Sequence, residues 1–266
     1  MDHPTSTLEH VTSADGTRIA YDRLGAGPPV VLLPGGSVDR MANAGLATLL
    51  AADFTVYNVD RRGRGDSGDT LPYAVQREIE DIEAVIAAAG GAAALYGSSS
   101  GAALAMQAAA QLGDQVTGLV LWEVPYFVDE AARPPADHVE QYDRMLAEGR
   151  RSDAVEYFMA NIVRLPPEFV AFAKTQPFFA ASEKIAHTLP YDGRVMGDYH
   201  PPLEIAAQVA APTLALAGGA SFPFMRETAE LLAATIPNGR PELLEGQEHN
   251  VDPAALAPAM KRFLTS

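Results

Sequence analysis

A serine, a glutamate and a histidine, far apart along the chain, have the residue types that acyl transfer requires. Ser99 is the central residue of a G-x-S-x-G pattern, G-S-S-S-G, at residues 97–101. A serine nucleophile needs a general base, a group that orients this base, and hydrogen-bond donors for the oxyanion. His249 is the candidate base and Glu123 the candidate orienting acid, and the chain order of nucleophile, acid and base fits such a triad.

The neighbours of Ser99 predict a sharp turn from a strand into a helix. An apolar run at residues 92–96 precedes the motif, and an alanine-rich run at residues 102–111 follows it. Such a turn holds the serine off the sheet edge at a helix N-terminus, where free backbone N–H groups favour developing negative charge. The alternative is a turn of small residues that only reverses the chain.

Two backbone N–H groups are expected to form the oxyanion hole. One belongs to Ser100, the residue after the nucleophile. The other belongs to Gly36, in the segment L-P-G-G-S that follows an early apolar strand. A missing side chain at Gly36 leaves its N–H free to face a substrate, although an ordinary glycine turn is the alternative.

Apolar runs alternate with amphipathic runs along most of the chain. This alternation predicts a mainly parallel sheet covered by helices on both faces, an α/β fold. The predicted strands are 17–21, 30–33, 54–59, 92–96, 116–122, 213–217 and 242–244, and the predicted helices are 39–51, 74–89, 102–111, 225–235 and 253–264.

Residues 126–204 interrupt this alternation. They contain no convincing buried strand, and helical spacing is found at 138–149, 152–162 and 167–175. We interpret residues 126–204 as a helical cap subdomain inserted into a core domain made of residues 1–125 and 205–266. The alternative is a set of ordinary crossover helices, for which the segment is long.

The candidate base and acid both follow strands at the edge where Ser99 is expected. His249 lies between the last predicted strand and the C-terminal helix, and Glu123 directly follows the strand 116–122. A carboxylate at the end of an apolar strand is costly unless it is paired, and an imidazole N–H is a suitable partner. Two alternatives remain: Glu123 forms a salt bridge at the cap hinge, or Asp252 is the acid. Asp252 precedes Pro253, a position typical of a helix N-cap.

Four motifs in this order resemble the α/β-hydrolase family over nearly the whole chain. They are L-P-G-G at 33–36, D-R-R-G-R-G-D-S-G at 60–68, the Ser99 turn and the His249 loop. The resemblance implies an α/β-hydrolase fold with a mainly parallel eight-stranded sheet, flanking helices and a helical cap insertion. The second motif is similar to the family's D-x-R-G-x-G-x-S segment, a structural turn, so neither Asp60 nor Arg61 is assigned to catalysis.

The chain departs from the family at two places. Pro34 stands where many members have histidine, but backbone donation by Gly36 does not require that histidine. The family usually has its triad acid just after the seventh strand, and the matching segment, 217–222, contains Ser221 and no carboxylate. Glu123 after strand six resembles instead the acid placement of haloalkane dehalogenases and of the fungal zearalenone lactonase.

Composition limits the class of protein. The chain has 266 residues, 48% of them hydrophobic, and a formal net charge of -15, which argues against nucleic-acid and anionic-membrane partners. It has no cysteine, so disulfides and thiolate catalysis are excluded.

We see no signal peptide, membrane-spanning run, metal-binding pattern or cofactor motif, and we expect a cytoplasmic enzyme without cofactor or metal. The sequence is compatible with a homodimer.

The resulting expectation is a serine hydrolase for a small or medium hydrophobic carboxylic ester or lactone. Trp122, Tyr126 and Phe127 are the expected substrate contacts, and the aromatic cap suggests a hydrophobic acyl or ring group. For each cap aromatic taken singly, ordinary packing in the core of the cap is the alternative. Analogy with the family leaves a C–C bond hydrolase and a peroxidase open, since the same triad serves both. A hydrolase-like protein that binds ligands without catalysis is the alternative of a different class.

Overall fold

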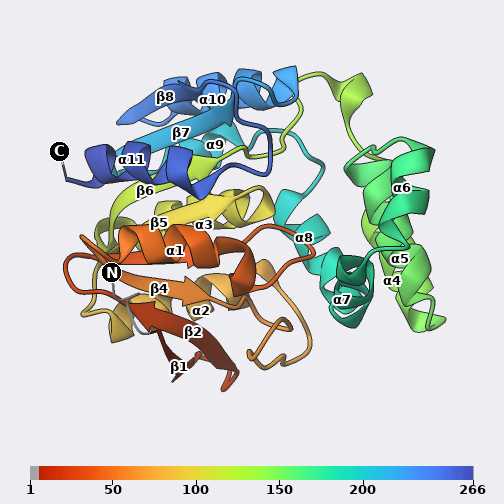
Figure 1. Ribbon diagram of the computed structural model, residues 1–266, viewed down its shortest axis with the longest axis horizontal. Helices are drawn as coiled ribbons and strands as arrows, with labels where there is room; N and C mark the ends of the chain where they lie inside the picture. Colours follow the sequence, from red (N-terminus) through yellow and green to blue (C-terminus); the bar gives the residue numbers. More distant parts are fainter. Residues whose placement is uncertain (1–5, 266) are drawn as a thin grey trace.

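A computed structural model describes residues 6–265 and shows one eight-stranded sheet between two layers of helices (Figure 1). The strand order in the sheet is β1-β2-β4-β3-β5-β6-β7-β8. The strands are β1 Thr7–Thr12, β2 Arg18–Leu24, β3 Pro29–Leu33, β4 Thr55–Val59, β5 Ala93–Ser98, β6 Val116–Trp122, β7 Thr213–Gly218 and β8 Gly239–Leu244.

The sheet is mainly parallel, as predicted. Strands β3 to β8 are joined by parallel pairing, whereas β1 pairs with β2 and β2 pairs with β4 in antiparallel fashion. Parallel strands end at one common edge, so the loops after β3, β5, β6, β7 and β8 meet there. The predicted α/β-hydrolase fold is therefore confirmed.

Alternate residues of the central strands enter two separate cores. In β3, Val31 and Leu33 pack with helices α2 and α3, whereas Val30 and Leu32 pack with α1 and α11 on the opposite face. Burial on both faces explains why the strand sequences are continuously apolar. The helices of these layers are α1 Ala44–Leu50, α2 Val75–Ala88, α3 Ser100–Leu112, α9 Leu203–Ala206, α10 Pro223–Thr235 and α11 Pro253–Leu264.

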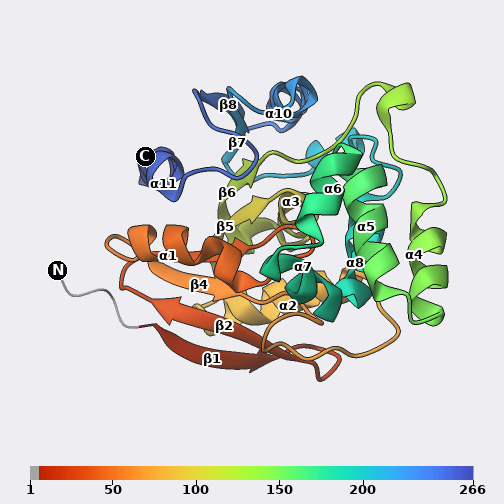
Figure 2. The same cartoon turned by 45° about the vertical axis from the view of Figure 1, so that its right-hand side comes forward.

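A group of helices between β6 and α9 lies beyond the edge where the parallel strands end (Figures 1 and 2). These helices are α4 His138–Ala147, α5 Arg151–Tyr157, the π-helix η4 Phe158–Ile162, α6 Pro167–Ala173, α7 Pro177–Lys184 and α8 Leu189–Met196. Short 3-10 helices occur at η1 Arg40–Asn43, η2 Gly113–Gln115, η3 Glu130–Ala132 and η5 Ala186–Thr188. The division into a core and a cap at 126–204 stays a prediction, and residues 1–5 and 266 of the predicted core lie outside the described part.

Some elements of the structure were not predicted, because their sequence signals are weak. Strand β1 was not predicted, because this edge strand is only partly buried and its sequence, T-L-E-H-V-T, is mostly polar. Helices α7 and α8 were also not predicted, since both are eight residues long and each has a proline in its first turn. None of the helices within residues 6–265 is long and apolar enough to cross a membrane.

Candidate active site

Ser99 occupies the turn between β5 and α3 in a backbone conformation that side chains rarely adopt. Its φ is 54° and its ψ is -125°. A Cβ atom on Gly97 would lie 2.3 Å from the carbonyl oxygen of Gly101, and one on Gly101 would lie 2.4 Å from that of Pro34. Close approach of three backbone segments therefore explains the glycines of the motif, and the serine between them is held at the strand end.

A buried glutamate at the end of β6 binds the imidazole of His249. Glu123 is fully buried, and its Oε2 lies 2.6 Å from Nδ1 of His249. Oε1 accepts a hydrogen bond from the Gly218 backbone N–H at 2.7 Å, and Oε2 accepts one from the Ser221 hydroxyl at 2.9 Å. Each carboxylate oxygen thus has a partner, which offsets the cost of burying the charge.

The structure also shows the hydrogen-bond partners of Asp252 and of Ser221. Asp252 accepts a hydrogen bond from the Ala254 N–H at 2.8 Å and caps the first turn of α11, so it is not the partner of His249. Ser221, at the position where the family usually has its acid, donates its hydroxyl hydrogen to Glu123. The serine therefore supports the carboxylate from strand six and does not replace it.

Trp122 links the nucleophile turn to the histidine loop. Its carbonyl oxygen accepts the N–H of Ser99 at 2.9 Å, and its indole N–H donates to the carbonyl oxygen of His249 at 2.9 Å. The indole itself is 1% exposed and packs in the core. The end of β6 thus positions Ser99, His249 and Glu123 relative to one another through two adjacent residues.

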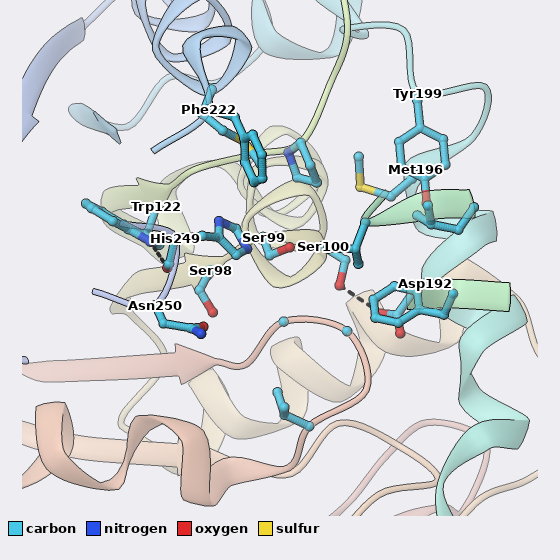
Figure 3. A pocket seen from close by; sticks show the side chains of 18 of the residues that line it. Ser98, Ser99, Ser100, Trp122, Asp192, Met196, Tyr199, Phe222, His249 and Asn250 are labelled. Carbon is cyan, nitrogen blue, oxygen red and sulfur yellow. Dashed lines mark hydrogen bonds between the residues drawn. The ribbon is translucent and has the colours of Figure 1, made fainter. Parts of the chain in front are cut away.

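A pocket of about 560 Å³ opens above these residues (Figure 3). Ser99, Ser100, Gly36 and His249 all line it, and this volume is typical of small-molecule sites. The remaining wall is mostly apolar; it includes Val38, Tyr96, Trp122, Phe127, Phe158, Ile162, Met196, Tyr199, Phe222, Phe224 and Met225.

The expected substrate contacts differ in their positions. Trp122 and Phe127 line the pocket, but Tyr126 does not; it is fully buried beside α10, where its carbonyl oxygen accepts the Thr228 hydroxyl. Because residues 123–127 run away from the strand end, neighbouring side chains face different environments, which the sequence could not reveal.

The Ser99 hydroxyl has no hydrogen-bond partner within residues 6–265.

A buried cluster of charges lies beside the pocket and was missed in the sequence. Arg61 binds both carboxylate oxygens of Glu78, at 2.7 and 2.8 Å, and Oδ1 of Asp192 at 2.7 Å. Arg64 binds Oδ2 of Asp192 at 2.7 Å. Burial opposes ionisation of Asp192, but Arg64 and Arg61 outweigh it and hold the pKa of this carboxyl below its usual range.

This cluster contacts Ser100 and the peptide that carries the Gly36 N–H. The Ser100 hydroxyl donates to Asp192 at 2.8 Å (Figure 3), and Arg64 donates to the carbonyl oxygen of Gly35 at 2.6 Å. That carbonyl shares a planar trans peptide with the N–H of Gly36, so the two groups point in opposite directions. Arg64 therefore fixes the direction of the Gly36 N–H. Asp192 lies in α8, far along the chain, and no motif marks it.

The Asp192 contacts lead to a stability prediction. Asp192→Asn removes the charge that Arg61 and Arg64 share, and we expect the free energy of unfolding in urea at pH 7 to fall by about 3–5 kcal/mol. Since the pKa of Asp192 is low in the folded protein, its contribution to the free energy of unfolding is complete at neutral pH and is lost as the pH falls below about 4. The difference in the free energy of unfolding between the wild type and Asp192→Asn should therefore become smaller in acid.

Asp143→Asn is the matched control for this prediction. Asp143 forms an exposed ion pair with Arg194 on the same group of helices, so its loss should change stability little. Equal urea midpoints for the wild type and Asp192→Asn would contradict the assigned role of the cluster.

Comparisons with known proteins identify the family of the chain. A model of the Alpha/beta hydrolase family matches residues 30–260. The N-formylmaleamate deformylase of Pseudomonas putida is 38% identical over 117 residues, which are 42% of this chain and 44% of that protein. This match therefore spans less than half the length of the curated relative.

Solved structures extend the likeness to the whole chain. An alpha/beta hydrolase from Sphaerobacter thermophilus is 52% identical, with a TM-score of 0.90 over 96% of this chain and 99% of that one. An esterase from Rhodococcus sp. ECU1013, at 23% identity, shares the fold with a TM-score of 0.71 over 97% and 98% of the two chains. The family match covers most of the sequence, and the protein therefore belongs to the alpha/beta hydrolase family.

Proposed function

We propose that this protein is a serine hydrolase that cleaves small or medium hydrophobic carboxylic esters or lactones through an acyl-enzyme on Ser99. The observation that carries the proposal is the hydrogen bond between the buried Glu123 carboxylate and His249, at the pocket that also contains Ser99. The apolar wall of this pocket supports a hydrophobic substrate.

In the proposed first step, the Ser99 hydroxyl oxygen attacks the carbonyl carbon of the ester. Nδ1 of His249 is bound to Glu123, which leaves Nε2 to accept the serine proton. The Gly36 and Ser100 N–H groups stabilise the negative oxygen of the tetrahedral intermediate. The bond to the alcohol oxygen then breaks, and His249 returns the proton to the leaving alcohol.

In the second step, water releases the acyl group. His249 takes one proton from water while the oxygen attacks the acyl carbon, and the same proton then passes to Ser99 as the acid departs. The free Ser99 hydroxyl suits this scheme, because catalytic hydrogen bonds often tighten only in the substrate complex. In a lactone the leaving alcohol stays attached, so the product is a single hydroxy acid.

Amide or N-formyl cleavage is the second candidate. The observation that favours it is the partial match to an N-formylmaleamate deformylase, because the same acyl-enzyme chemistry also cleaves a C–N bond. Initial rates with p-nitrophenyl esters of increasing chain length, a set of lactones and a set of N-formyl amides would separate the two candidates.

The nucleophile can be tested by covalent labelling. A fluorophosphonate probe should attach to folded wild-type protein at Ser99, identified by tandem mass spectrometry, because this reagent needs an activated serine. Ser99→Ala and heat-denatured wild type serve as controls and should not be labelled. Labelling at another residue, or none in the folded wild type, would overturn the proposed mechanism.

The acid can be tested by Glu123→Gln. This change retains the side-chain shape but removes the negative charge beside His249, and we expect kcat to fall by about 10³–10⁴-fold with a smaller change in KM. Ser221→Ala, which removes only one hydrogen bond to the carboxylate, should cost about tenfold. Circular dichroism would establish that both variants are folded, and a kcat for Glu123→Gln within a few fold of wild type would exclude Glu123 as the acid.

A further inference from the structure

One guanidinium, that of Arg164, belongs to the largely apolar pocket wall. The other charged side chains of the wall already have partners: Asp192 is bound by Arg61 and Arg64, and His249 by Glu123. Arg164 has no carboxylate partner within residues 6–265. The wall therefore carries one positive charge that nothing in the described chain neutralises.

The local backbone brings Arg164 to the pocket through two uncommon conformations. The π-helix η4 precedes it, with the Val163 N–H bound to the carbonyl oxygen of Phe158 at 2.9 Å. Arg164 itself has a φ of 62°, in the left-handed region. Ile162, Val163 and Arg164 consequently all line the pocket, although they are consecutive. Such conformations are costly and are concentrated at functional sites.

The Arg164 side chain is held in place and keeps most of its donors. Its guanidinium carbon lies 5.5 Å from the centre of the Phe127 ring, and one terminal nitrogen donates to the carbonyl oxygen of Arg133 at 2.9 Å. A guanidinium has five N–H donors in a planar fork, so an oxygen pair of a ligand still has suitable partners. Phe127 and Arg164 together form an oriented cationic part of the wall of an apolar pocket.

We infer that Arg164 is an anion subsite, and that the natural substrate carries a carboxylate on its apolar part. This inference rests on the proposed hydrolase function and narrows its substrate class to esters, lactones or amides with a free carboxylate. The chain has a formal net charge of -15, so its overall field repels anions, and a local cation is needed to select one.

The subsite can be tested by binding, without any catalytic turnover. Trp122 is the only tryptophan of the chain and lines the pocket, so its fluorescence reports occupancy, with calorimetry as a second measure of Kd. We expect 4-phenylbutanoate to bind about five- to tenfold more tightly than the neutral 4-phenylbutanamide. Arg164→Gln should weaken binding of the acid and leave binding of the amide unchanged, so that the ratio of the two affinities falls to about one. Arg164→Lys should retain part of the preference for the acid.

Arg150→Gln is the matched control. It removes one positive charge from the same group of helices, but Arg150 lies outside the pocket wall and pairs with Glu148 and Asp153 at the surface. This variant should keep the full preference for the acid. Thermal unfolding of Arg164→Gln close to that of wild type would show that the fold is retained.

Three results would overturn the subsite: equal affinities in wild type, no binding of either ligand, or a preference that survives Arg164→Gln. The last result would place the anion at His249 or the oxyanion donors. Because binding requires no turnover, these outcomes are independent of fluorophosphonate labelling at Ser99. The binding test can therefore contradict the subsite while the labelling test still supports the proposed hydrolase function, and the reverse.

Discussion

The hydrogen bond between a fully buried carboxylate and a half-exposed imidazole is the interaction on which the rest of the site depends. Glu123 ends a strand that is buried on both faces, where an unpaired charge would be very costly. The Gly218 N–H and the Ser221 hydroxyl satisfy this carboxylate from the end of β7, and His249 does so from the loop after β8. Three adjacent parallel strands thus meet at one carboxylate, and their common edge is where the Ser99 turn also lies.

A second buried carboxylate has a comparable role on the other side of the pocket. Asp192, in a helix of the predicted cap, binds two arginines of the turn after β4 and the hydroxyl of Ser100. Asp192 also binds Arg64, which donates a hydrogen bond to the carbonyl oxygen of the Gly35–Gly36 peptide. Packing of this helix is therefore physically connected to the Ser100 side chain and to the orientation of the Gly36 N–H. The same helix therefore contributes both polar and apolar side chains to the lining of the pocket.

Much of the fold was predictable because parallel strands have a strong signal. The strand Val116–Trp122 and the helix Pro253–Leu264 have the predicted bounds. Ser99 and His249 were proposed from their places after strands, and both line the same pocket. Glu123 was suggested by an absence, the lack of a carboxylate at 217–222, and its position fits that reasoning. Long-range pairing was not predictable: the charge cluster joins residues more than a hundred positions apart, and Arg164 reaches the pocket only because a π-helix and a left-handed residue redirect the chain.

The most direct test of the central interaction observes the imidazole proton itself. Proton NMR of the wild type near neutral pH should show a strongly downfield signal from the His249 Nδ1–H, because a short hydrogen bond to a buried carboxylate deshields this proton and slows its exchange with water. The signal should disappear in His249→Gln and move far upfield or vanish in Glu123→Gln, while remaining in Asp252→Asn. A downfield signal that persists unchanged in Glu123→Gln, or its absence from the wild type, would contradict the pairing of Glu123 with His249.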